Sequence, residues 1–225
     1  MRPRPSVRAA ILAGALSLIA TTNASGAVPA RASADTSGTS PTANVARVGV
    51  DKRRLSIRAG RRVVVIGRAE PGFPDLRALL QIRSGHRWRT IDRDRTAAGG
   101  RYVLRGRIWR PMSVPARVVI HAGGGRLRKR VGRVDAFRLA SASWYGPGLY
   151  GNRLGCGGTL TASRLGVANK ALPCGTKVTL RHGRRVVRVR VIDRGPFVAG
   201  REYDLTAATA DRLGFHGHGA ILTTR

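Results

Sequence analysis

Short runs in which apolar and polar residues alternate are the feature that most limits how this chain can fold. In the run 101–108, Tyr102, Leu104 and Ile108 fall on one face of an extended strand, and the three arginines fall on the other. Comparable runs occupy residues 61–68, 78–83, 87–92, 116–121 and 127–134, separated by Pro or Gly. Strands at this spacing predict a mainly β fold, with an immunoglobulin-like β-sandwich over residues 47–139. Trp88, in phase with the apolar face of its run, is expected in the core.

The sequence pattern changes at residue 140, where short strands alternate with tight glycine turns. One helix is predicted there, from about Thr206 to Leu213, with Asp204 or Thr206 as its N-cap. Gly214 is the residue expected to end it. Residues 140–225 are therefore predicted to form a second β-rich domain with one short helix.

The first residues have the organisation of an export signal. Arg2, Arg4 and Arg8 precede an apolar stretch over residues 9–20, and the small residues 25–27 follow as a cleavage site. We expect a signal peptide over 1–27, a flexible small-residue linker over 28–46, and an exported protein that is extracellular or associated with the cell wall. No cysteine lies directly after the apolar stretch, at the new N-terminus that cleavage would leave, so lipid attachment is not expected. No apolar run approaches the roughly 20 residues of a membrane span.

The charge of the chain is strongly unbalanced. Its 225 residues include 42 Lys+Arg and 11 Asp+Glu, a formal net charge of +31. Residues 45–139 alone carry 25 basic and 6 acidic residues, a net charge of +19. Such a segment attracts polyanions, and for an exported chain we expect anionic wall polymers rather than nucleic acid. The alternative is that these arginines simply cover solvated strand faces.

Two cysteines and two histidines are the candidates for covalent or metal chemistry. Cys156 and Cys174 lie in one domain of a chain expected to be exported, which favours a disulfide between them, and two buried free thiols are the alternative. They lack the partners of a zinc site. His216 and His218 form a pair without a third ligand, so we expect neither a metal nor a cofactor.

Asp193 ends the most informative strand. Val187, Val189 and Val191 share one face, and Asp193 continues it. Partial burial would favour a protonated carboxyl that can donate a proton to a glycosidic oxygen. Alternatively, Asp193 accepts backbone N–H bonds in the turn that follows and stays charged. The strand pattern does not separate the two.

Four runs in the second domain resemble a known family. They are ASWYG at 142–146, ALPCGT at 171–176, VIDRGPF at 191–197 and GREYDLT at 200–206. In this order they resemble the rare lipoprotein A (RlpA) family, whose barrel domain is a six-stranded double-psi β-barrel. The resemblance implies a peptidoglycan lytic transglycosylase, which cleaves glycan strands and leaves 1,6-anhydro sugar ends. It does not extend to residues 45–139.

The resemblance also implies site residues. The catalytic pair would be Asp193 and Asp204, one as the acid and base and the other stabilising positive charge on the sugar. The glycan-binding residues would be Trp144, Tyr145, Tyr150, Asn169, Lys170 and Arg194. We expect the protein to act as a monomer on peptidoglycan.

Two positions depart from the family pattern. Gly158 stands where many members carry Glu, and Asn169 stands where they carry His. Asn can hydrogen-bond a sugar but cannot titrate. A second hypothesis is therefore a catalytically impaired, glycan-binding module of the cell wall. A third is a polyanion binder that acts through the basic segment.

Overall fold

The computed structural model describes Val45 and residues 47–225. The predicted signal peptide and all of the predicted linker except Val45 lie outside these residues. The described part is mainly β with one short α-helix, as predicted. In that part, no helix is both long and apolar enough to span a membrane.

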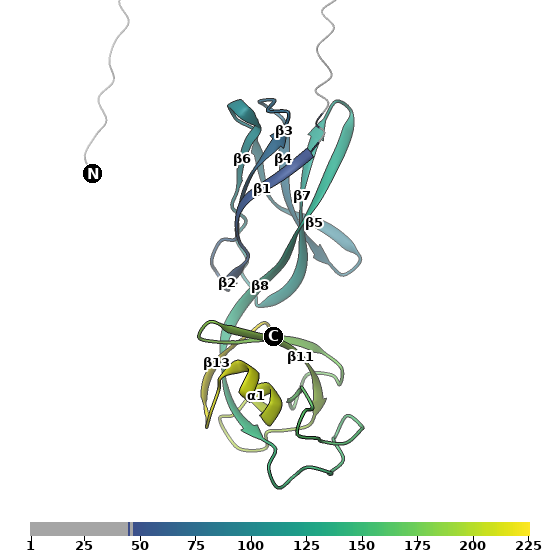
Figure 1. The fold of residues 1–225 in the computed structure, drawn as a ribbon, viewed down its shortest axis with the longest axis vertical. Coiled ribbons are helices and arrows are strands. Elements are labelled where there is room, and N and C mark those ends of the chain that lie inside the picture. Colours follow the sequence, from purple (N-terminus) through teal and green to yellow (C-terminus); the bar gives the residue numbers. More distant parts are fainter. Residues whose placement is uncertain (1–44, 46) are drawn as a thin grey trace, which may run out of the picture. The chain divides into compact units, whose positions relative to one another are not determined.

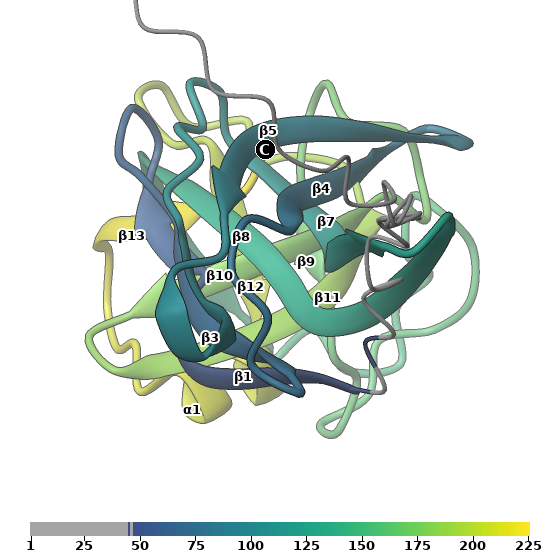
Figure 2. The ribbon, with the colours of Figure 1, turned by 90° about the horizontal axis from the view of Figure 1, so that it is seen from above.

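The strands of the first half form two sheets. The first contains β1 (Arg47–Arg54), β3 (Val64–Glu70) and β6 (Arg101–Leu104), all antiparallel. The second contains β4 (Arg77–Ser84), β5 (Arg87–Arg95), β7 (Met112–Ala122), the first part of β8 (Gly125–Tyr145) and the short β2 (Ser56–Arg58). In Figure 2, β4 lies between β5 and β7, as the strand pairing requires.

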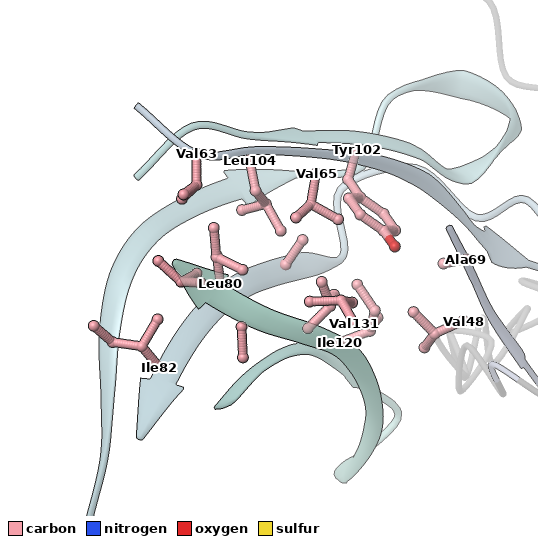
Figure 3. Close-up of a cluster of buried hydrophobic side chains, with 14 of the residues drawn as sticks. Val48, Val63, Val65, Ala69, Leu80, Ile82, Tyr102, Leu104, Ile120 and Val131 are labelled. Carbon is pink, nitrogen blue, oxygen red and sulfur yellow. The ribbon is translucent and has the colours of Figure 1, made fainter. Parts of the chain in front are cut away.

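One hydrophobic core lies between these two sheets. Figure 3 shows Val65, Tyr102 and Leu104 from the first sheet pointing toward Leu80 and Ile120 of the second. All five side chains are fully buried. The alternation in the sequence is therefore the alternation of core-facing and solvent-facing residues on these strands.

The structure differs from the sequence prediction at two places in this half. Strands β1 and β2 were not predicted, because residues 51–54 are four charged residues in a row with no apolar alternation. The prediction that Trp88 is a core residue was wrong. A register shift after Leu80 pairs Trp88 with Arg83 on the outer face, where the Arg117 guanidinium lies 4.1 Å from the centre of its ring.

The second half, which contains β11 (Arg185–Asp193), β13 (Gly219–Thr223) and helix α1 (Ala207–Leu213), closes into a barrel (Figure 1). The strand pairings put six strands in its wall. They are the end of β8, β9 (Val167–Ala168), β10 (Lys177–His182), β11, β12 (Tyr203–Thr206) and β13. The pairing runs β8, β13, β10, β11, β9, β12 and back to β8. Every strand of the ring therefore has two neighbours, and the barrel leaves no open sheet edge.

Strand β8 contributes to both halves. Its Ala136 pairs with Met112 of β7 and belongs to the first core, whereas its Ala140 pairs with Ile221 of β13 and belongs to the barrel core. The boundary that the sequence predicts at residue 139 thus falls inside a continuous strand.

Helix α1 (Ala207–Leu213) has the caps that the sequence predicts. The Thr206 hydroxyl accepts from the Thr209 backbone N–H at the start, and Gly214 ends the helix with φ 62° and ψ 40°. Leu213 and Ala210 turn its apolar face into the barrel core. The helix directly follows β12, the strand that carries Asp204.

Candidate functional site

The two predicted catalytic aspartates lie on one face of the barrel wall. Ala168 of β9 pairs with Asp193 of β11 on one side and with Asp204 of β12 on the other. Residues that pair across strands point to the same face of a sheet, so the small Ala168 side chain lies between the two carboxylates. Two strand spacings place their Cα atoms roughly 10 Å apart. The barrel thus brings together two residues separated by a turn in the sequence.

Asp204 is the partly desolvated member of the pair. Burial raises its pKa above the ordinary value, and the charge of Asp193 acts in the same direction. The Ser143 hydroxyl donates to its Oδ1 at 2.8 Å, and this bond, like the charge of Arg201, opposes the rise in pKa. Arg201 Nη1 in turn donates to Ser143 Oγ at 3.4 Å. Asp204 therefore holds its proton to a higher pH than an exposed aspartate does.

Asp193 accepts three hydrogen bonds. The backbone N–H groups of Gly155 and Arg194 donate to its Oδ1 at 2.7 and 2.8 Å. The Tyr145 hydroxyl donates to its Oδ2 at 3.1 Å. The strand pattern left two interpretations of Asp193 open. The geometry agrees with the second, in which the Asp193 carboxylate accepts hydrogen bonds from backbone N–H groups. These three donors fix the orientation of the carboxylate.

Tyr145 faces the pair from β8. It lies two residues after Ser143 and so shares a strand face with it. Burial, followed by the charge of Asp193, raises the pKa of its hydroxyl, which keeps Tyr145 a hydrogen-bond donor. The structure thus gives Tyr145 a role in positioning Asp193. Its contact with glycan stays a prediction.

A disulfide joins the loops beside the aspartates. Cys156 and Cys174 are bonded, with their Cα atoms 5.5 Å apart. The Cys156 N–H donates to Ile192 O and the Gly175 N–H donates to Val191 O, so both loops attach to β11 just before Asp193. The loop that carries Gly155, a donor to Asp193, is tethered by this bond.

Two of the predicted glycan-binding residues hold the neighbouring loop. The Arg194 guanidinium donates from Nη1 to the carbonyl groups of Asn169 and Leu172, at 3.0 and 2.7 Å. The Asn169 side chain donates to Glu202 O at 2.9 Å and accepts from the N–H groups of Ala171 and Leu172. Asn169 is only 5% exposed. The structure therefore gives both side chains a role in loop architecture.

The remaining predicted glycan contacts are exposed. Trp144, 38% exposed, pairs with Leu205 and so points to the opposite strand face from Ser143 and Tyr145. Tyr150 packs beside Gly146, where its hydroxyl would lie 3.0 Å from an added Cβ. Lys170 lies at the surface of the turn after β9. Of these three, Tyr150 lies beside the end of the strand that carries Tyr145.

The backbone conformation at Gly158, the position where many family members carry Glu, favours glycine. Gly158 has a φ of 81°, which L side chains rarely adopt. His216 and His218 are both exposed. Among Val45 and residues 47–225, no group of three or more His, Cys, Asp or Glu side chains is placed to hold a metal ion.

Sequence reasoning missed three contributors to the site: Ser143, Gly155 and Arg201. Ser143 shares the strand phase of Tyr145 and lies in the run 142–146, so its phase could have identified it. Gly155 acts through its backbone alone. No side-chain pattern signals such a donor, and only the tertiary fold brings it to Asp193.

Comparison with known proteins matches the barrel domain. A family model described as lytic transglycolase matches residues 139–223, the segment that closes into the six-stranded barrel around the two aspartates. Residues 139–223 are an RlpA-like double-psi β-barrel domain. The resemblance seen in the sequence is thereby confirmed for this domain.

Several curated relatives share the RlpA-like domain. One, named probable endolytic peptidoglycan transglycosylase RlpA, from Synechocystis sp., is 42% identical over 102 residues, 40% of this chain and 32% of that protein. The endolytic peptidoglycan transglycosylase RlpA of Campylobacter jejuni is 46% identical over 74 residues, 32% of this chain and 27% of that protein. The protein of the same name from Neisseria meningitidis is 32% identical over 111 residues, 44% and 46% of the two chains. The matches span less than half the length of these relatives.

Proposed function

We propose that the RlpA-like domain cleaves peptidoglycan glycan strands as a lytic transglycosylase. The observation that carries the proposal is the pair of carboxylates on either side of Ala168, of which one, Asp204, is desolvated and the other, Asp193, is held by three donors. Two carboxyl groups in different environments are what glycosidic cleavage needs from a protein. The names of the relatives point to the same chemistry and substrate.

Asp204 is the acid and base in this proposal. Its protonated carboxyl donates to the glycosidic oxygen as the bond from that oxygen to C1 breaks. The 6-hydroxyl oxygen of the same sugar then bonds to C1 and closes the 1,6-anhydro ring. Its proton passes to the Asp204 carboxylate, which restores the acid. No water is consumed, so the atoms and charges balance without a further reactant.

Asp193 acts electrostatically. Its oriented carboxylate stabilises the positive charge that develops on the sugar in the transition state. The Gly155 and Arg194 N–H groups and the Tyr145 hydroxyl keep it in one position, so little reorganisation is needed during the reaction. This assignment puts the acid at Asp204, whereas the strand pattern left Asp193 open as either a protonated acid or an acceptor of backbone N–H bonds.

Mass analysis of products tests the proposal. Peptide-free glycan strands incubated with the full chain should yield fragments ending in 1,6-anhydro sugars. Asp204→Asn should abolish these fragments while retaining glycan binding, because the shape of the site is kept. Hydrolytic products without anhydro ends, or full activity of Asp204→Asn, would contradict the mechanism.

The pH profile tests which aspartate is the acid. Ser143→Ala removes a hydrogen bond that lowers the pKa of Asp204, so that pKa should rise. A general acid loses activity as pH rises above its pKa. The alkaline limb of the profile should therefore move to higher pH in Ser143→Ala, with cleavage retained. An unmoved alkaline limb would assign the acid elsewhere.

A glycan-binding module without catalysis is the second candidate. Asn169, at the family histidine position, is committed to backbone partners, and Gly158 supplies no carboxylate. Retained glycan binding with no anhydro product from the unaltered chain would favour this candidate. Gly158→Glu is a poor rescue variant because of the positive φ at that position.

The proposal extends to the rest of the chain. We infer that residues 47–139 are an immunoglobulin-like accessory sandwich, that residues 1–27 direct export, and that the protein works as a monomer at the cell wall. The two-sheet arrangement with one core supports the first point. The order of basic, apolar and small residues at the start of the sequence supports the second.

A further inference from the structure

A pocket of about 630 Å³, away from the two aspartates, is lined mainly by arginines. Its arginines are Arg54, Arg58, Arg61, Arg62, Arg107 and Arg181, and the other lining residues are Ser56, Ile57, Gly60 and Leu222. No acidic residue lines it. The six arginines are the largest group of like charge that lines any described pocket of this protein.

These arginines have no acidic partner in the part of the chain that the structure describes. The four ion pairs found there involve Arg47, Arg68, Arg95 and Arg138 instead. Like charges gathered at a surface repel one another, even with the partial screening that water and salt provide. An anion in the pocket would relieve this repulsion.

The pocket is also partly preorganised. Arg62 and Arg107 are backbone partners in an antiparallel bridge, which places their side chains next to each other. Arg107 Nε donates to Gly60 O at 2.8 Å, and its guanidinium lies 4.3 Å from the centre of the Trp109 ring. Arg181 Nη1 donates to Ser56 Oγ at 3.4 Å. Buried Ile57 forms part of the apolar wall.

We propose that this pocket binds a chain of phosphodiester groups, the chemistry of an anionic wall polymer. All six cations are arginines, whose planar guanidinium forks match phosphate oxygens in bidentate pairs. Six guanidinium groups distributed around 630 Å³ cannot all contact one phosphate ion, but they can contact successive phosphates along a flexible chain. The pocket would hold the protein on the wall while the barrel acts on glycan.

A charge-matched pair of triple variants tests this assignment on the full chain. The pocket variant is Arg58→Gln, Arg61→Gln and Arg62→Gln. The control variant is Arg87→Gln, Arg93→Gln and Arg128→Gln, which removes the same charge from exposed positions outside the pocket. Binding to poly(glycerol phosphate) is measured at fixed ionic strength, with inorganic phosphate and polyglutamate of equal charge as competitors.

The pocket variant should bind poly(glycerol phosphate) at least tenfold more weakly, and the control variant less than threefold more weakly. Inorganic phosphate and polyglutamate should compete poorly. Equal losses in both variants would overturn the site, because binding would then follow net charge alone. If inorganic phosphate competed with an affinity equal to that of the polymer, the pocket would be a site for a free phosphate ion. If polyglutamate competed as well as poly(glycerol phosphate), the pocket would have no preference for phosphate over carboxylate. Cleavage of peptide-free glycan should be the same in both variants, so failure here leaves the proposed function standing.

Discussion

The acidic residues of the two-sheet half, called the sandwich below, and the two aspartates of the barrel site have different surroundings. In the sandwich, each of the six carboxylates has an arginine, backbone or hydroxyl partner at the surface or between strands: Asp51, Glu70, Asp75, Asp92, Asp94 and Asp135. In the barrel, Asp193 and Asp204 flank the same alanine on one strand face, and burial raises the pKa of Asp204. The same type of side chain thus stabilises sheet structure in one half and forms the proposed site in the other.

The cause of this difference lies in the neighbours of each carboxylate. Sandwich acids lie among many arginines, because residues 45–139 carry 25 basic residues. Asp204 is partly buried and has a second carboxylate nearby, and both disfavour its charge despite the hydrogen bond from Ser143 and the charge of Arg201. Four predictions test how far the contrast holds.

The largest effect is expected from removing charge at the site. Asp193→Asn should slow release of anhydro products about a thousandfold, because electrostatic stabilisation of a transition state has this magnitude. Asp92→Asn, the matched change in the sandwich, should leave the rate unchanged, because Asp92 only accepts from the Arg105 N–H. Equal rates for both variants would show that the barrel carboxylate has no special role.

Loss of the disulfide should destabilise the barrel. Its two cysteines are 18 residues apart, and closing a loop of this length contributes about 3 kcal/mol in the chain-entropy model. Cys156→Ala with Cys174→Ala should therefore lower the melting temperature, and hydrogen exchange should quicken at residues 154–175 but not in β4 or β7. Reductant should lower the melting temperature of the original chain and leave the double variant unchanged. Two alkylatable thiols in the unreduced, denatured chain would falsify this account.

A single added methyl group should disturb Asp193. In Gly155→Ala the new Cβ would lie 3.0 Å from Asp193 Oδ1 and 2.9 Å from Arg194 Cγ. Both are too close, so the carboxylate or the loop must move, and we expect about a tenfold loss of cleavage. Gly125→Ala in the sandwich is the control, since its Cβ would have only Ala122 O as a neighbour, at 3.5 Å. Unchanged cleavage in Gly155→Ala would mean that the position of Asp193 is not critical.

The smallest effect concerns stability and pH. Because the pKa of Asp204 is higher in the folded state, the folded protein binds more protons between the unfolded pKa, near 3.9, and the folded pKa. The contribution of Asp204 to the free energy of unfolding therefore falls as pH rises through this window. Asp204→Asn should raise the melting temperature at pH 7 by about 2 °C and lose this advantage near pH 4.

The sandwich supplies a control of opposite sign for this last effect. Asp94 accepts from the Val103 N–H at 2.7 Å and from the Arg95 N–H at 2.9 Å. Asp94 uses one carboxylate oxygen for each bond, whereas an Asn side chain has a single acceptor oxygen. Asp94→Asn should therefore lose one of the two bonds and lower the melting temperature at pH 7. Calorimetry on both variants at pH 4 and pH 7 measures the contrast. A shift of the same sign in both variants would contradict the difference between the two halves.

Local patterns predicted much of the fold. The alternation of Val187, Val189 and Val191 correctly identified the core face of β11, and Thr206 with Gly214 correctly bounded α1. The patterns failed where strand pairing departs from simple alternation. Trp88 lies outside the core because of a register shift between β4 and β5, which is a property of two strands rather than of one.

The sequence by itself determined where strands and the helix form, because side-chain periodicity and helix caps depend on residues only a few positions apart. It also carried the four runs that identify the barrel domain. Only the tertiary structure decided which aspartate is desolvated and which is held by donors. Those properties depend on Ser143, Tyr145 and Gly155, which lie far from Asp193 and Asp204 in the sequence and meet them only when β8, β9, β11 and β12 close into the barrel.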